Sequence, residues 1–188
     1  RETALALARR GARVLVNDYG GGASAVKPGC NDVASAVVAE IAAMGGEAIA
    51  DATAVGSGEA AQAIIGAAMK AFGRIDILVN NAGGNITTGV EQLDDARAQA
   101  IFDSNFTGGW MLLRKCWAPM RENGFGRIVN VMSGAMLGLP GRGVYASAKA
   151  AYLGLTTVAA TEGAPHDIRV NGVWPTAQTR LMDGIDDP

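Results

Sequence analysis

Tyr145 and Lys149 are four residues apart in the stretch Tyr145-Ala-Ser-Ala-Lys149, and Ser133 precedes the tyrosine by twelve residues. On a helix, positions i and i+4 lie on one face, one turn apart. A free phenol has a pKa near 10, about three units too high for proton transfer at neutral pH. Three pKa units correspond to roughly 4 kcal/mol, and the attraction of an ammonium about 4 Å away is about that large. Because the pair is common in helices, its chemistry depends on the elements that position it.

Composition narrows the class of protein. The chain has 188 residues, is 49% hydrophobic and contains 26 glycines, which is typical of an α/β enzyme. A net charge of −2 gives no electrostatic case for binding nucleic acid. No apolar run reaches the roughly 18 residues that a membrane span needs. Cys30 and Cys116 belong to no metal-spaced cluster and indicate free thiols. We therefore expect no membrane or nucleic-acid partner, and a cytoplasmic location by default.

Short apolar runs alternate with helical segments along the whole chain. The expected strands cover 13–17, 47–50, 75–79, 127–131 and 168–173, and the main helices cover 32–44, 58–72, 93–121 and 144–161. This order predicts parallel strands with helices on both faces, in one domain spanning 1–188. The predicted fold is a doubly wound, Rossmann-like α/β sheet in three α/β/α layers, which binds ligands beyond the carboxyl ends of its strands. Asp18, Asn81 and Ser133 all follow expected strand ends.

Several short motifs, in order and at fitting distances, resemble the short-chain dehydrogenase/reductase family over essentially the whole chain. They are Asn80-Asn-Ala-Gly83, Asn105 within Ser104-Asn-Phe-Thr107, Ser133 before Gly134, Tyr145-Ala-Ser-Ala-Lys149, Ile168-Arg-Val-Asn-Gly-Val173, and Pro175 followed by Thr179. The resemblance implies hydride transfer between a nicotinamide cofactor and a secondary alcohol or carbonyl carbon.

The resemblance also implies a role for each catalytic residue. Tyr145 would donate or accept the proton on the substrate oxygen, and Lys149 would lower its pKa and bind the nicotinamide ribose. Ser133 would hold and polarise the substrate oxygen. Asn105 would interrupt the long helix and anchor a water that links Lys149 to solvent. A positioned proton donor of this kind contributes about 10²–10⁴-fold to the rate.

The cofactor site is expected at the strand ends. A carboxylate at Asp18 can accept both ribose hydroxyls of NAD and would repel the 2′-phosphate of NADP, so NAD is the expected cofactor. By resemblance, Asn81, Ala82 and Gly83 form the turn behind the adenine ribose, and Thr179 reaches the cofactor near its phosphates. Where the family often has an adenine-binding Asp, this chain offers Thr53 or Ala54, with Asp51 slightly earlier. The adenine contact therefore stays open.

By the same resemblance, the Gly-rich phosphate loop and the first strand would precede Arg1, and the last strand and helices would follow Met182. We therefore expect the given sequence to be part of a longer chain. In the family's strand order, 3-2-1-4-5-6-7, the first strand is central, so the second and fourth strands should have unpaired edges. We expect Asn80 mainly to tie neighbouring strands together. His166 is the only histidine, is expected at the surface, and has no partner ligands for a metal site.

Two alternatives stay open: an NADPH-dependent carbonyl (3-oxoacyl-type) reductase and a non-catalytic dinucleotide-binding protein. Apolar residues Met136, Leu137, Leu139 and Pro140 predict a small-molecule substrate with a hydrophobic end. The stretch 16–20 and the loop after it resemble the 3-hydroxyacyl-CoA dehydrogenase branch of peroxisomal multifunctional enzymes. Family members are often tetramers, so a homo-oligomer, either a dimer or a tetramer, is expected through helices 92–121 and 144–161.

Overall fold

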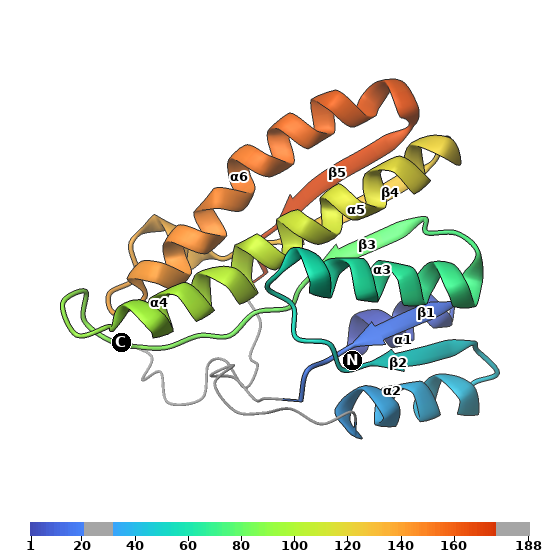
Figure 1. Cartoon of the computed structure of the whole chain (residues 1–188), viewed down its shortest axis with the longest axis horizontal. Coiled ribbons are helices and arrows are strands. Elements are labelled where there is room, and N and C mark those ends of the chain that lie inside the picture. The colour runs from blue at the N-terminus through green and yellow to red at the C-terminus, as the bar shows by residue number, and fades with distance from the viewer. Residues whose placement is uncertain (21–31, 176–188) are drawn as a thin grey trace.

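The computed structural model describes residues 1–20 and 32–175, in which strands and helices alternate (Figure 1). The strands are β1 (Val14–Asn17), β2 (Ala48–Asp51), β3 (Ile77–Asn80), β4 (Gly126–Val131) and β5 (Ile168–Val173). The α-helices are α1 (Glu2–Ala8), α2 (Asp32–Ala43), α3 (Gly58–Phe72), α4 (Asp95–Phe102), α5 (Gly108–Glu122) and α6 (Gly143–Gly163). Three short elements complete the described residues: the π-turn η1 (Asp103–Thr107) and the 3₁₀ turns η2 (Gly134–Leu137) and η3 (Ala164–His166).

Every strand pair is parallel, as the alternation of helices and strands predicts. The strands form two sheets, one in the order β1-β2 and one in the order β3-β4-β5. In the part of the chain that the structure describes, β1 and β3 lie at neighbouring edges and are not paired with each other (Figure 1). These are the two edges that the resemblance predicted to be unpaired.

Helices cover both faces of β1, so the three-layer architecture is confirmed. Val14 and Val16 pack with residues of α1 and α2 in one hydrophobic cluster. Leu15 points to the other face and packs against a second cluster, built from α3, α5, β4 and β5. This alternation follows from the two-residue period of a strand, whose successive side chains point to opposite faces.

The long helix expected over 93–121 is interrupted, as the resemblance implied for Asn105. α4 ends at Phe102, the π-turn η1 follows, and α5 begins at Gly108. Asn105 lies in the middle of η1, and its Nδ2 donates to the carbonyl oxygen of Ile101 at 2.9 Å. π-turns inside helices are rare and are often found at functional sites.

Two glycines at the start of α5 allow close packing of this helix against its neighbours. A methyl group added at Gly109 would overlap the hydroxyl of Tyr152 and come within 3.2 Å of the Asn80 side chain. A methyl group at Gly108 would overlap the side chain of Val55. Tyr152 is 1% exposed, so its ring cannot move aside without disturbing the core.

We predict that Gly109→Ala lowers the free energy of unfolding by about 1–3 kcal/mol, because overpacking strains a filled core. Chemical denaturation monitored by circular dichroism measures the change. Gly66→Ala is the matched control, since Gly66 is exposed in the middle of α3 with no atom within 4 Å of the added methyl. It should stabilise the protein by about 0.5–1 kcal/mol through helix propensity alone. Equal effects of the two substitutions would contradict this explanation.

Candidate active site

The residues expected to do chemistry lie at one edge of the sheets. Asp18 follows β1, Asn81 follows β3, and Ser133 comes two residues after the end of β4. Since the strands of each sheet are parallel, each sheet has its carboxyl ends along one edge, and the arrows of β1 and β3 point the same way (Figure 1). This is the edge at which doubly wound sheets bind their ligands.

Lys149 is a buried cation held at the end of β4. Its side chain lies on α6, the residue is 4% exposed, and Nζ donates to the carbonyl oxygen of Val131 at 2.9 Å. Nζ also lies 5.8 Å from the centre of the Tyr145 ring, so the two residues share one face of the helix. Burial lowers the pKa of the Lys149 amine to about 8. At pH 7 the protonated form therefore still predominates.

Ser133 and Tyr145 both lie between Val131 and Lys149 in the sequence. Tyr145 is half-buried in the first turn of α6. Ser133 caps η2, where its Oγ accepts a hydrogen bond from the backbone N–H of Ala135 at 3.2 Å. No described residue accepts a hydrogen bond from the Ser133 hydroxyl. The hydroxyl can therefore donate to a bound oxygen atom while the cap stays intact.

Asn105 joins the π-turn to the loop after β3. It is fully buried, and its Nδ2 donates to the carbonyl oxygen of Gly84 at 2.7 Å as well as to that of Ile101. A methyl group at Gly83 would overlap Asn105 Oδ1, so only glycine fits there. Asn105 Oδ1 has no protein partner among the described residues. A buried acceptor in this position suits an ordered water.

Asp18 and Asp51 lie at the carboxyl ends of β1 and β2, and their carboxylates have different hydrogen-bond partners. Asp51 Oδ1 accepts from Asn17 Nδ2 at 2.7 Å and from the N–H of Thr53 at 2.9 Å, so it serves the local structure. Asp18 Oδ1 accepts only from the N–H of Gly20, at 2.8 Å, among the described residues. Asp18 therefore keeps acceptor capacity for hydroxyl groups of a ligand, whereas Oδ1 of Asp51 is already engaged within the protein.

The remaining cofactor candidates are only partly described. Asn81, Ala82 and Gly83 are exposed in the loop after β3, where a ligand can reach their backbone. Thr179 lies outside the described residues. Asp18 and the open loop at the carboxyl ends fit the hydroxyls and backbone contacts of a nicotinamide dinucleotide.

A buried network that the sequence reasoning missed lies behind these residues. Asn80 Nδ2 donates to Asn130 Oδ1 at 2.9 Å, and Asn130 Nδ2 donates to Thr156 Oγ1 at 2.9 Å. These bonds tie β3, β4 and α6 together, which agrees with the strand-tying role expected for Asn80. The signal was present in the sequence: Val-Asn pairs recur at 16–17, 79–80, 129–130 and 170–171.

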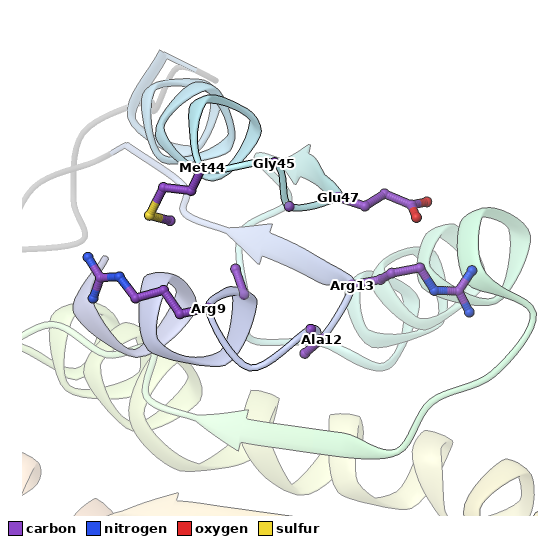
Figure 2. A pocket seen from close by; sticks show the side chains of 9 residues that line it. Arg9, Ala12, Arg13, Met44, Gly45 and Glu47 are labelled. Carbon is purple, nitrogen blue, oxygen red and sulfur yellow. The ribbon is translucent and has the colours of Figure 1, made fainter.

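A cavity at the opposite end of the strands is lined by none of the expected residues. It has a volume of about 470 Å³ and lies between the ends of α1 and α2, where Arg9 and Arg13 point in opposite directions (Figure 2). Arg13 is engaged by the carbonyl oxygen of Phe72 at 2.8 Å. The residues expected to do chemistry therefore lie away from this cavity, at the carboxyl ends of the strands.

The described ranges contain no group of three His, Cys, Asp or Glu side chains that could hold a metal ion. His166 is exposed at the end of η3, as expected. Across residues 1–20 and 32–175, none of the helices has the length and apolar character that crossing a membrane requires.

The sequence is similar to those of curated proteins. The chain is 39% identical to the peroxisomal hydratase-dehydrogenase-epimerase of Saccharomyces cerevisiae over 97% of its own length and 20% of that protein. It is also 39% identical to a 3-oxoacyl-[acyl-carrier-protein] reductase of Synechocystis, over 93% of this chain and 68% of the relative. The chain thus spans only a fifth of the length of the yeast protein.

Solved structures share the fold. A short chain dehydrogenase from Mycobacterium avium matches with a TM-score of 0.85 and 36% identity, over 98% of this chain and 66% of the other. A metagenomic short-chain oxidoreductase in complex with NADP gives 0.83 at 30% identity, over 96% and 77%. NAD⁺-bound xylitol dehydrogenase gives 0.82 at 30% identity, over 92% and 64%. The short chain dehydrogenase family model matches residues 1–185, and the chain belongs to this family.

Proposed function

We propose that the protein is an NAD-dependent oxidoreductase that interconverts a secondary alcohol and its carbonyl compound. Membership of the short chain dehydrogenase family supports a nicotinamide cofactor and chemistry on CH–OH groups. The observation that carries the proposal is the buried amine of Lys149, bonded to the end of β4 and 5.8 Å from the Tyr145 ring. The dinucleotide supplies the hydride acceptor or donor, and the protein supplies the proton and the orientation.

Tyr145 is the proposed proton donor or acceptor on the substrate oxygen. The Lys149 ammonium stabilises negative charge on the phenol oxygen, and partial burial strengthens this attraction relative to water. Lys149 also binds the nicotinamide ribose in this proposal. Ser133, whose hydroxyl has no described acceptor, holds and polarises the substrate oxygen.

Asn105 is a proposed anchor for a water between Lys149 and solvent. Its buried Oδ1 lacks a protein partner, which supports an ordered water there. Such a water lets the proton that passes through Tyr145 reach bulk solvent without opening the site.

The preference for NAD is proposed from Asp18. Its carboxylate retains acceptor capacity at the end of β1, and it would repel a 2′-phosphate. Structures similar to this chain were solved with NAD⁺ and with NADP, so family membership alone does not set the preference. An NADPH-dependent carbonyl reductase is therefore the second candidate.

The substrate is proposed to carry an apolar end. Leu137 and Leu139 are 86% and 46% exposed in the segment between β4 and α6, close in sequence to Ser133 and Tyr145. Exposed leucines beside a site indicate contact with an apolar ligand surface. The name of the yeast relative describes a peroxisomal enzyme. For this protein, a cytoplasmic location stays a prediction.

A homo-oligomer is proposed to form through α5 and α6. Val158 and Leu153 on α6 are 56% and 54% exposed, and Trp110 on α5 is 37% exposed. Trp110 and Val158 line a mostly apolar groove of about 290 Å³ between the two helices. An apolar patch on paired helices suits an isologous contact with a second copy.

Tyr145→Phe in the complete protein should lower kcat about 10²–10⁴-fold, because the ring remains and only the proton-transferring hydroxyl is lost. Absorbance of NADH measures turnover. Tyr152→Phe is the matched control on the same helix and should retain activity. Unchanged turnover in Tyr145→Phe would remove this residue from the mechanism.

Asp18→Ser should lower kcat/KM for NAD about 10–100-fold and raise it for NADP, because charged hydrogen bonds to the ribose are lost along with the repulsion. Both cofactors are compared in one assay. Asp76→Asn, at the amino end of β3, is the control and should not change the ratio. If wild-type protein already prefers NADP, the NAD assignment is wrong.

Val158→Glu should shift the protein to a smaller species in sedimentation velocity, because the interface would bury an unpaired carboxylate. Val33→Glu replaces an exposed valine on α2 and should leave the assembly unchanged. A wild-type protein that sediments as a monomer would exclude the proposed oligomer.

A further inference from the structure

Arg142 is a mostly buried arginine beside the candidate site and has no ion-pair partner among the described residues. Among the arginines of the described ranges it alone is buried, with 6% of its surface exposed. Ion pairs in this part of the chain involve Arg1, Arg74, Arg97, Arg127 and Arg169, and none includes Arg142. No described residue accepts a hydrogen bond from its guanidinium, and none of its nitrogens is among the buried polar atoms that lack a partner, so they reach the surface. Its N–H donors are therefore free of described partners and can bind a ligand.

The position of Arg142 brings it close to the reacting groups. It is the N-cap residue of α6, and Tyr145 follows three residues later in the first turn of that helix. Burial lowers the pKa of the guanidinium and the neighbouring Tyr145 raises it, which agrees with this proximity. No carboxylate contributes to the charge balance there.

The backbone around Arg142 is fixed. The carbonyl oxygen of Gly141 accepts from the N–H of Thr88 at 3.0 Å, and that of Arg142 accepts from Ala146 at 2.7 Å. Gly141 has a φ of +73°, a conformation that glycine adopts without strain. The first turn of α6 contains no acidic residue and no side-chain cap, so its N–H groups add to the positive potential.

We propose that Arg142 binds a carboxylate on the substrate, close to the carbon that carries the reacting oxygen. The planar guanidinium can hold both carboxylate oxygens, which a neutral ester or thioester cannot match. Together with exposed Leu137 and Leu139, this favours a hydroxy acid with an apolar tail, oxidised to the corresponding oxo acid. The inference rests on the proposed oxidoreductase function and narrows its substrate class.

Matched substrates test this inference in the complete protein with NAD: 3-hydroxyoctanoate, its methyl ester and its N-acetylcysteamine thioester. Wild-type kcat/KM should favour the acid at least about tenfold. Arg142→Gln should lower kcat/KM for the acid about 10–100-fold, mainly through KM, because a charged hydrogen bond is lost in ground state and transition state alike. The ester and thioester should change less than about threefold, and Arg142→Lys should fall between wild type and Arg142→Gln.

Arg9→Gln is the control, because Arg9 is exposed at the opposite end of the strands. It should leave all three substrates unaffected. Equal losses on acid, ester and thioester in Arg142→Gln would indicate a structural role and overturn the proposal, as would a wild-type preference for the ester or thioester. If Arg142→Gln raised the KM for NAD and left the KM for the acid unchanged, Arg142 would belong to the cofactor site, and the proposal would be overturned.

Binding without turnover separates this inference from the proposed function. Millimolar 3-hydroxyoctanoate should raise the thermal unfolding midpoint of wild-type protein by about 2 °C, and that of Arg142→Gln hardly at all. The methyl ester should not distinguish the two proteins. A shift in wild type without any turnover would support the carboxylate site while contradicting the oxidoreductase. Absence of a shift in wild-type protein would overturn the carboxylate site even if turnover is seen.

Discussion

The hydrogen bond between Lys149 and the end of β4 fixes the geometry on which the candidate site depends. The amine is buried, and burial lowers its pKa to about 8, so it stays mostly protonated at neutral pH. A backbone carbonyl at 2.9 Å, that of Val131, offsets part of the cost of keeping this charge away from water. Because Val131 ends β4 and Lys149 belongs to α6, this contact sets where the helix lies against the sheet.

A second polar contact joins the same two elements. Asn130 precedes Val131 on β4, Thr156 follows Lys149 by seven residues on α6, and the two side chains are hydrogen-bonded. Asn80 extends the network to β3. Hydrogen bonds between buried side chains favour the arrangement that makes them, because breaking one leaves polar groups unpaired away from water. Ser133, beyond β4, and Tyr145, on α6, are therefore held in one relative position by both contacts.

The sequence predicted what depends on local pattern and could not predict what depends on distant partners. Strand runs and helix periodicity predicted the parallel α/β layers, and the strand ends predicted where Asp18 and Ser133 lie. The engagement of Asp51 with Asn17 could not be read from the chain, because it depends on strand register. The tight fit at Gly109 likewise depends on Tyr152, which is 43 residues later.

Positive potential gathers at the amino end of α6 from three sources: the uncapped N–H groups, Arg142 and Lys149. The described part of this helix start contains no acid that would neutralise it. Such a field stabilises negative charge wherever it appears, whether on a bound carboxylate or on an oxygen losing its proton.

Stabilising these two kinds of negative charge affects different steps of the reaction. A carboxylate is equally charged in substrate and transition state, so its binding sets affinity and selectivity. Charge that develops only during proton transfer gains from the field in the transition state, so Lys149, next to Tyr145, is the cation placed to affect rate.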